Sequence, residues 1–387
     1  MAFTVTNNPQ AATVLKAMLN PGYADISHWD AYLAACATNA GKGINPSFKQ
    51  ITPPSTASTG NQLGLLAPNG CIYITPYGET SLKINTITDT CSVINMESAL
   101  SSNWNAGVLG NNNKLYWIGG GRNILCLDPT TEERTYNLSP IVDDFTHTFG
   151  LQIGQDGKVY TMLKKTIDTV VTFALGVLDL DSLTITPTSL VFPVGILSTA
   201  STMITGLDGF IYVLGSNSKP VKINTLNYTY EVLPNVWTKG STQGAAKIVK
   251  NGDVYYPSTS ASTFMEGYSL SQAVPEGFQV ELTGMSRNRK NKAIFNMHNG
   301  VTYTWSESVG QLDLPTRDWW ENTFNLSGWP VLSMGDGEGL LAQNGKFYSL
   351  PQSYNPRIIV VDLGMTNPVL PPLATYLSQW FNTKNTG

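Results

Sequence analysis

Charged side chains are scarce in this sequence. Only 13% of its 387 residues are Asp, Glu, Lys or Arg, and the formal net charge is -4, whereas an average soluble chain is roughly 25% charged. A balance this close to neutral gives little reason to expect nucleic acid or an anionic membrane surface as the main partner. Disorder is also excluded, because it requires low hydrophobicity together with high net charge, and 42% of the residues are hydrophobic. We therefore expect a folded protein.

Long apolar runs and targeting signals are missing as well. No window approaches the roughly 18 unbroken apolar residues of a membrane-spanning helix. The first ten residues, MAFTVTNNPQ, contain no basic stretch followed by an apolar core, which is the pattern of a secretory signal peptide. The sequence predicts neither a signal peptide nor membrane insertion.

Cysteine is rare and widely spaced. The four cysteines are Cys36, Cys71, Cys91 and Cys126, with no CxxC pair and no histidine at ligand spacing. A zinc site or a disulfide framework is therefore not predicted. Outside an oxidising compartment such thiols stay reduced. We expect no metal and no cofactor.

Residues typical of catalysis are also few. There are three histidines, and one of them, His147, lies three residues after Asp144 in the segment DDFTH. That spacing could serve acid–base chemistry, but a loop of solvated carboxylates between two repeats is the favoured interpretation. No arrangement of Ser, His and Asp stands out. We therefore predict no catalytic residue and no enzyme activity.

The sequence is rich, by contrast, in glycine, tyrosine and a repeated pattern. The segment GLLAPNGCIYITP, from Gly64 to Pro76, matches GLLAQNGKFYSLP, from Gly339 to Pro351, at eight of thirteen positions. Related segments lie between them, each marked by a tyrosine: the seven are Tyr73, Tyr116, Tyr160, Tyr212, Tyr255, Tyr303 and Tyr348. The intervals are 43, 44, 52, 43, 48 and 45 residues, a period typical of propeller blades.

Each repeat has the turn signals of antiparallel strands. An apolar run meets Asn-Gly or Asp-Gly four residues before the tyrosine, except at Asn112-Asn113, and we interpret this pair as a type I′ hairpin turn. A third strand then ends in Asn or Asp followed by Thr or Ser, as at Asn85, Asp128, Asp181 and Asn224. These residues are typical of turns in which the side chain bonds its own backbone. A fourth strand follows.

Four strands per unit without intervening helices predict an all-β fold, a seven-bladed β-propeller of four-stranded antiparallel blades, because such sheets bury their faces by radial packing. We expect the propeller to span residues 61–371. Residues 1–60 should form a helical hairpin and a connector, and residues 372–387 a short C-terminal helical tail. Within the connector, Phe48 to Ile51 form a candidate strand that would close the ring against the last blade.

The repeat resembles the Asn-Gly-x-Ile-Tyr propellers, loosely kelch-like, that recur in bacterial and tailed-bacteriophage proteins, many of them virion components. The resemblance covers residues 64–370. It departs from kelch repeats because regular double glycines are missing, and from WD repeats because the Trp-Asp dipeptide is missing. The matching residues are turn and core positions, so the resemblance is informative about fold and weak for function.

The resemblance implies a non-enzymatic structural or interaction subunit of a bacteriophage virion: a tail, hub, fibre or head-attached protein made in the host cytoplasm. Its expected partners are other virion proteins, in a homo-oligomeric or symmetric assembly. The alternative is a carbohydrate-binding propeller for host adhesion that binds a host surface glycan. A propeller lyase or glycosidase is a third hypothesis, which would need convergent carboxylates, or His, Arg and Tyr, in the channel.

Two segments supply candidate contacts to a partner or a glycan. Trp319 and Trp320 form the densest aromatic stretch, and an exposed tryptophan can stack on a sugar or a protein surface; the alternative is core filling between blades. The only basic cluster consists of Arg287, Arg289, Lys290 and Lys292. It could hold phosphates, although a solvated hairpin loop is the favoured interpretation.

Overall fold

The computed structural model describes residues between 47 and 362, and every regular element among them is a β-strand. The segments outside the description are 1–46, 55–63, 77–79, 97–103, 120–122, 139, 143, 198–200, 207, 216–218, 235–246, 249–252, 257–263, 271–275, 282–292, 297–301, 306–308, 313–318, 322–335, 343, 352–356 and 363–387. In the described part no helix is long and apolar enough to cross a membrane.

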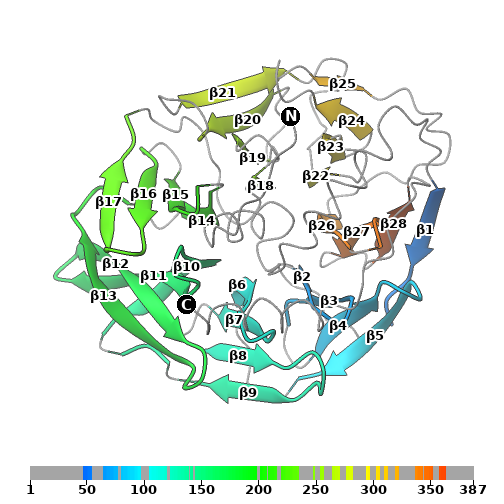
Figure 1. Ribbon diagram of the computed structural model, residues 1–387, viewed down its shortest axis with the longest axis horizontal. Helices are drawn as coiled ribbons and strands as arrows, with labels where there is room; N and C mark the ends of the chain where they lie inside the picture. The colour runs from blue at the N-terminus through cyan, green and yellow to red at the C-terminus, as the bar shows by residue number, and fades with distance from the viewer. Residues whose placement is uncertain are drawn as a thin grey trace, which may run out of the picture.

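Six blades are built from four consecutive antiparallel strands each (Figure 1). Blade one comprises β2 (Gly64–Leu66), β3 (Cys71–Ile74), β4 (Thr80–Asn85) and β5 (Thr90–Asn95); blade two comprises β6 (Trp104–Leu109), β7 (Leu115–Gly119), β8 (Ile124–Leu127) and β9 (Arg134–Asn137). Blade three comprises β10 (Thr146–Ile153), β11 (Val159–Ile167), β12 (Val170–Asp179) and β13 (Thr184–Phe192).

Blade four comprises β14 (Ser201–Thr205), β15 (Ile211–Gly215), β16 (Val221–Asn224) and β17 (Thr229–Val232). Blade five comprises β18 (Lys247–Ile248), β19 (Asp253–Tyr256), β20 (Phe264–Ser269) and β21 (Glu276–Glu281); blade six comprises β22 (Ala293–Asn296), β23 (Thr302–Trp305), β24 (Val309–Leu312) and β25 (Trp319–Glu321). The first strand of each blade faces the centre of the ring and the fourth lies at the rim (Figure 1).

The remaining sheet is composite. Its inner strands are β26 (Asp336–Leu341), β27 (Phe347–Pro351) and β28 (Ile358–Asp362), and its rim strand is β1 (Ser47–Ile51) from the other end of the chain. The antiparallel pairing runs from Ser47 opposite Asp362 to Ile51 opposite Ile358. The composite sheet lies beside blade one and closes the ring (Figure 1). The prediction of a closing strand at Phe48 to Ile51 is thereby confirmed.

The predicted fold class needs correction. We expected seven complete blades encoded within 61–371, together with helices at both ends, and this prediction is wrong. Only six blades are complete as consecutive units, and the composite sheet takes its rim strand from residues 47–51. Without β1, the edge of β28 would leave a row of unpaired backbone groups. The described part contains no helix, and the segments in which we expected helices, residues 8–39 and 372–387, lie outside it.

The repeated tyrosine occupies the second strand of every sheet. All seven repeated tyrosines are at most 2% exposed. Four of them lie in apolar clusters that span neighbouring sheets: for example, Tyr73 lies with Leu115 and Trp117 of blade two, and Tyr348 lies with Ile72 and Ile84 of blade one. Each blade therefore buries its faces against its neighbours, which explains why a single repeat would not be stable alone.

The turn type also differs from the prediction. In the first hairpin Gly70 has a φ of 76° and its N–H donates to the carbonyl of Ala67, while the N–H of Ala67 donates to Cys71. Asn69 is not among the residues with positive φ. This is a type I turn followed by a glycine bulge, so the predicted type I′ turn is wrong. Both turns favour Asn-Gly, but only the glycine needs positive φ here.

Candidate interaction surface and inter-blade network

The residue before the turn glycine forms hydrogen bonds with the repeated tyrosine. Asn69 accepts the N–H of Cys71 at 3.0 Å and donates from Nδ2 to the hydroxyl of Tyr73 at 3.0 Å. The same pair recurs as Asn112–Tyr116 at 2.7 Å, Asp156–Tyr160 at 2.8 Å, Asp208–Tyr212 at 2.7 Å and Asn344–Tyr348 at 3.0 Å. The Asn/Asp-Gly-x-x-Tyr pattern therefore encodes a polar link from turn to core as well as a turn.

Three of these tyrosines reach the next sheet. The hydroxyl of Tyr73 contacts the carbonyl of Pro129 at 3.3 Å, Tyr116 contacts Leu180 at 3.3 Å, and Tyr348 contacts Thr86 at 3.1 Å. Each carbonyl belongs to the turn between the third and fourth strands of the neighbouring blade. Burial raises the pKa of all three tyrosines, so each hydroxyl stays protonated. We did not predict this inter-blade link, although the four-residue spacing signalled it.

The turns between the third and fourth strands of blades one to four share one geometry. Their first side chain accepts backbone N–H groups within the turn: Asn85 from Ile87 at 2.9 Å, Asp128 from Thr130 at 2.9 Å, Asp179 from Ser182 at 2.8 Å and Asn224 from Leu226 at 2.9 Å. The predicted turns are confirmed, except that Asp179 replaces Asp181 in blade three. Four residues later the backbone is left-handed, at Asp89, Glu132, Leu183 and Tyr228, with φ between 50° and 61°.

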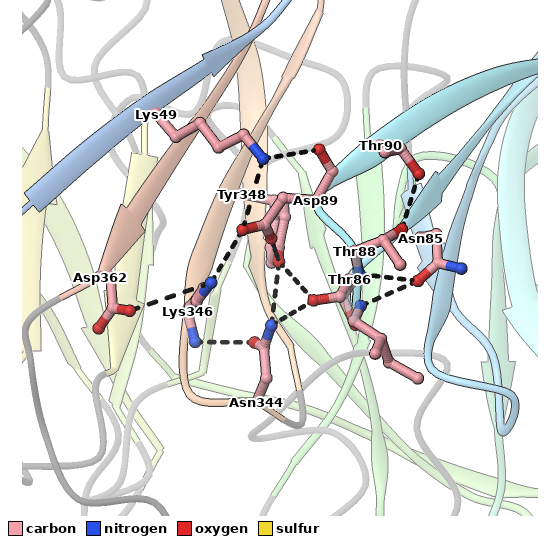
Figure 2. Close-up of polar contacts among 11 residues, drawn as sticks. Lys49, Asn85, Thr86, Thr88, Asp89, Thr90, Asn344, Lys346, Tyr348 and Asp362 are labelled. Atoms are coloured by element: carbon pink, nitrogen blue, oxygen red, sulfur yellow. Dashed lines mark hydrogen bonds and ion pairs between the residues drawn. The ribbon is translucent and has the colours of Figure 1, made fainter.

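Asp89 uses this left-handed position to join blade one to the composite sheet (Figure 2). Its carboxylate accepts the hydroxyl of Tyr348 at 2.5 Å and the ammonium of Lys346 at 2.9 Å. Lys49 on β1 donates to the Asp89 carbonyl at 3.2 Å and lies 3.9 Å from its carboxylate. Burial opposes the charge, but the hydrogen bonds from Tyr348 and Lys346 and the charges of both lysines lower the pKa of Asp89 below its ordinary value.

Blade three is larger than its neighbours and has one uncovered face. Its second and third strands, β11 and β12, have nine and ten residues, whereas β7 and β8 of blade two have five and four. Alternate residues share a face, as do cross-strand partners. Leu163, opposite Ala174, is buried against blade two. Farther out the same face presents Ile167 and Val170, paired with each other and 57% and 48% exposed.

The opposite face of this blade is packed. Phe173 and Phe192 are paired across β12 and β13 and lie in an apolar cluster with blade four. Val191, which is paired with Ala174, lies on the open face instead and is 51% exposed. Six of the nine large hydrophobic side chains exposed in the described part belong to blade three or its connections: Leu138, Val142, Ile167, Val170, Val191 and Val194. Exposed aliphatic surface is therefore concentrated on one blade.

Asp144 and His147 do not form an acid–base pair. The side chain of Asp144 is 90% exposed and lies 3.5 Å from Lys165. His147 is buried on β10, and neither of its ring nitrogens has a hydrogen-bond partner. Burial lowers the pKa of His147 to about 4, against an opposing effect of the Gly150 backbone. The segment therefore holds a solvated carboxylate and a neutral core histidine.

The structure does not test the predicted contact residues. Trp319 and Trp320 lie on β25, the rim strand of blade six, opposite Leu312 and Gln311. The basic cluster at 287–292 lies outside the described residues. The assignment of either segment to a partner or a glycan stays a prediction.

The thiols in the described part are free. Cys71 and Cys126 are buried and Cys91 is half-buried; burial raises the pKa of all three thiols, that of Cys91 to about 12. Such thiols are poor nucleophiles and metal ligands at neutral pH. Among the described residues, no cluster of His, Cys, Asp and Glu is arranged to hold a metal ion.

The comparisons with known proteins identify the fold. No family model and no curated protein matches the sequence. Several solved propellers match the structure. U3-55K is 9% identical, with a TM-score of 0.56 over 82% of this chain and 98% of that one. The WD40 repeats of RRP9 are 9% identical, with a TM-score of 0.55 over 83% of this chain and 100% of that one.

A third match is the extracellular domain of BT4673 from B. thetaiotaomicron, described as a one component system. It is 14% identical, with a TM-score of 0.52 over 81% of this chain. The match spans only 39% of that chain. The chain is therefore a β-propeller by structure, and at these identities the likeness extends to the fold alone.

Proposed function

We propose that this propeller is a non-enzymatic interaction subunit that docks to a second copy of itself through the open face of blade three. The observation that supports this most directly is the exposure of three aliphatic side chains on this face, Ile167, Val170 and Val191, with Lys165 and Thr172 in the row between them. Aliphatic surface left in water by a projecting blade is typical of a protein contact site. The propellers found by comparison fit a platform role, since propellers commonly present rigid surfaces to partners.

Charge favours a second copy as the occupant. An isologous interface requires a patch that is complementary to itself. Lys165 lies on the open face between Leu163 and Ile167 and forms an ion pair with Asp144 at 3.5 Å, so this face carries both signs. A purely basic or acidic border would favour an oppositely charged partner instead.

The hairpin tip at the edge of this face contains unfavourable backbone conformations. Asp168 and Thr169, between the paired residues Ile167 and Val170, have φ values of 46° and 70°. A β-branched residue in the left-handed region is unfavourable. Strained residues that persist in exposed turns concentrate at binding sites, which supports a role for this hairpin.

Sedimentation velocity over a wide concentration range tests the docking face. Three aliphatic side chains cover less than the roughly 800 Å² per partner of a stable interface, so we expect weak, concentration-dependent association. The double variant Ile167→Ser, Val170→Ser should stay monomeric. Ile87→Ser is the matched control, because Ile87 is 79% exposed on blade one, and it should associate as the wild type does. A wild type that is monomeric at every concentration contradicts the proposal.

The larger setting that we propose is a tailed-bacteriophage virion, with the protein made in the host cytoplasm and assembled with other virion proteins. Support comes from the repeat's resemblance to virion propellers. Mass spectrometry of particles purified from the natural source should detect the chain at a stoichiometry that matches a symmetric substructure. Its consistent absence from intact particles would contradict the virion assignment without affecting the docking face.

Glycan binding for host adhesion is the second candidate. Trp319 and Trp320 lie on a rim strand, and the rim of a propeller is accessible to large ligands. A glycan array with the wild type and with Trp319→Ala and Trp320→Ala tests it: binding that both substitutions abolish supports adhesion, and no binding by the wild type contradicts it.

A further inference from the structure

The junction between the composite sheet and blade one differs from the others because its outermost strand arrives from the other end of the chain. We call this junction, formed by β1, the β26–β27 turn and the 85–90 turn of blade one, the seam. An apolar cluster spans it and includes Ile51, Ile72, Ile84, Tyr348 and Ile358. The polar groups above this cluster are drawn in Figure 2.

The polar part of the seam converges on one carboxylate. The Asp89 side chain is 12% exposed, and it receives Lys346 and Tyr348 of the composite sheet. The Tyr348 hydroxyl oxygen accepts a hydrogen bond from Asn344 Nδ2 at 3.0 Å, so the proton of the hydroxyl is donated to an acceptor of blade one. A charge-assisted bond to the carboxylate is stronger than one to a neutral carbonyl. Lys49 adds a contact from β1 to the same residue.

Among the four junctions whose left-handed turn residue is described, two carry a carboxylate at that position and only one of these collects two lysines and a tyrosine. Glu132 of blade two meets Lys83 alone. Leu183 of blade three lies in an apolar cluster with Tyr116. The ring of Tyr228 in blade four lies 6.5 Å from that of Tyr160. The seam therefore depends most on charge.

We propose that Asp89 is an electrostatic latch, so that loss of its charge or screening of the seam releases β1 and the composite sheet from blade one while the six consecutive blades stay folded. The other groups that face this carboxylate are Lys346, Tyr348 and Lys49, and Asp362 lies behind Lys346 at 4.0 Å. Lys49 lies on β1 itself, so a change of charge at Asp89 directly weakens a contact of the closing strand.

Hydrogen–deuterium exchange of the full chain at neutral pH tests the latch. Asp89→Asn removes the charge, keeps the size and retains a residue that tolerates left-handed backbone. We expect exchange to accelerate about tenfold or more in residues 47–51 and 358–362. Exchange in blades two and three should be unchanged. The matched control Glu132→Gln, at the equivalent position of blade two, should leave residues 47–51 unaffected.

Two results would overturn the proposal. One is unchanged exchange at 47–51 and 358–362 in Asp89→Asn; the other is an acceleration spread evenly over all blades. If that variant does not fold, the wild type decides: raising NaCl from about 0.05 to about 1 M shortens the Debye length several-fold. If Asp89 is a latch, high salt accelerates exchange at the seam more than in blade three. Equal protection of the seam at both salt concentrations contradicts it.

Discussion

At the scale of single residues, the repeat combines two requirements in a short segment. The turn glycine must adopt positive φ, with values of 76° to 79° at Gly70, Gly157, Gly209 and Gly345. The preceding Asn or Asp must reach the tyrosine four residues on. In blade two Asn113 takes the glycine position with a φ of 65°, which shows that Asn can replace glycine where a β-branched residue could not.

Gly345→Val or Gly209→Val should destabilise the protein by about 1–3 kcal/mol, because valine at positive φ is strained. Chemical denaturation measures the change in the free energy of unfolding. Asn113→Gly is the control at the same turn position and should be neutral or stabilising, since the buried Oδ1 of Asn113 has no hydrogen-bond partner. Equal stability of the valine variants and the wild type would contradict the turn assignment.

His147 should make the protein sensitive to mild acid. Its folded-state pKa of about 4 lies below the unfolded value of about 6.5, so the unfolded chain binds the proton more readily. Stability is therefore fully present above about pH 6.5 and falls as the pH drops toward 4, by roughly 3 kcal/mol at 1.36 kcal/mol per unit. Unfolding titrations at several pH values should show this slope in the wild type and lack it in His147→Leu. A shared slope would show that another group is responsible.

At the scale of elements, the period of the tyrosines located the second strand of every sheet, and the Asx residues located the turns. The 52-residue interval between Tyr160 and Tyr212 was the longest, and it marks the extended blade three; that signal was present but we did not use it. The hairpin type could not be read from Asn-Gly because two turn families share that pair. The Asp89 latch was beyond sequence reasoning, since Lys346 lies 257 residues away from Asp89.

The tip of the blade-three hairpin should be improvable. Replacing Asp168-Thr169 by Asn-Gly places residues that tolerate positive φ at both positions of a two-residue turn that prefers this pair. We expect a stability gain of about 0.5–1 kcal/mol or more in thermal or chemical unfolding. Self-association should be retained, because Ile167 and Val170 are unchanged. A loss of stability would mean that Asp168 or Thr169 makes contacts that outweigh the backbone strain.

At the scale of the whole molecule, the ring is held together by repeated tyrosine links between adjacent sheets and by the pairing of β1 with β28, which joins the two ends of the described chain. The pairing explains why counting repeats was insufficient: in the described part of residues 61–371 the last three strands have no fourth partner, and β1 fills that place. Closure of this kind leaves β28 without a free edge. It also makes the stability of the ring depend on residues 47–51.

The most direct test of ring closure is a cross-link between β1 and β28. Ser47 and Asp362 lie opposite each other in the antiparallel register, so Ser47→Cys with Asp362→Cys should form a disulfide under mild oxidation. Peptide mass mapping should identify that bond, and the oxidised protein should unfold at higher temperature than its reduced form. Ser47→Cys with Asn224→Cys, on blade four, is the negative control. Failure of the first pair to cross-link, or linkage of both pairs to the same extent, would contradict closure of the propeller by β1.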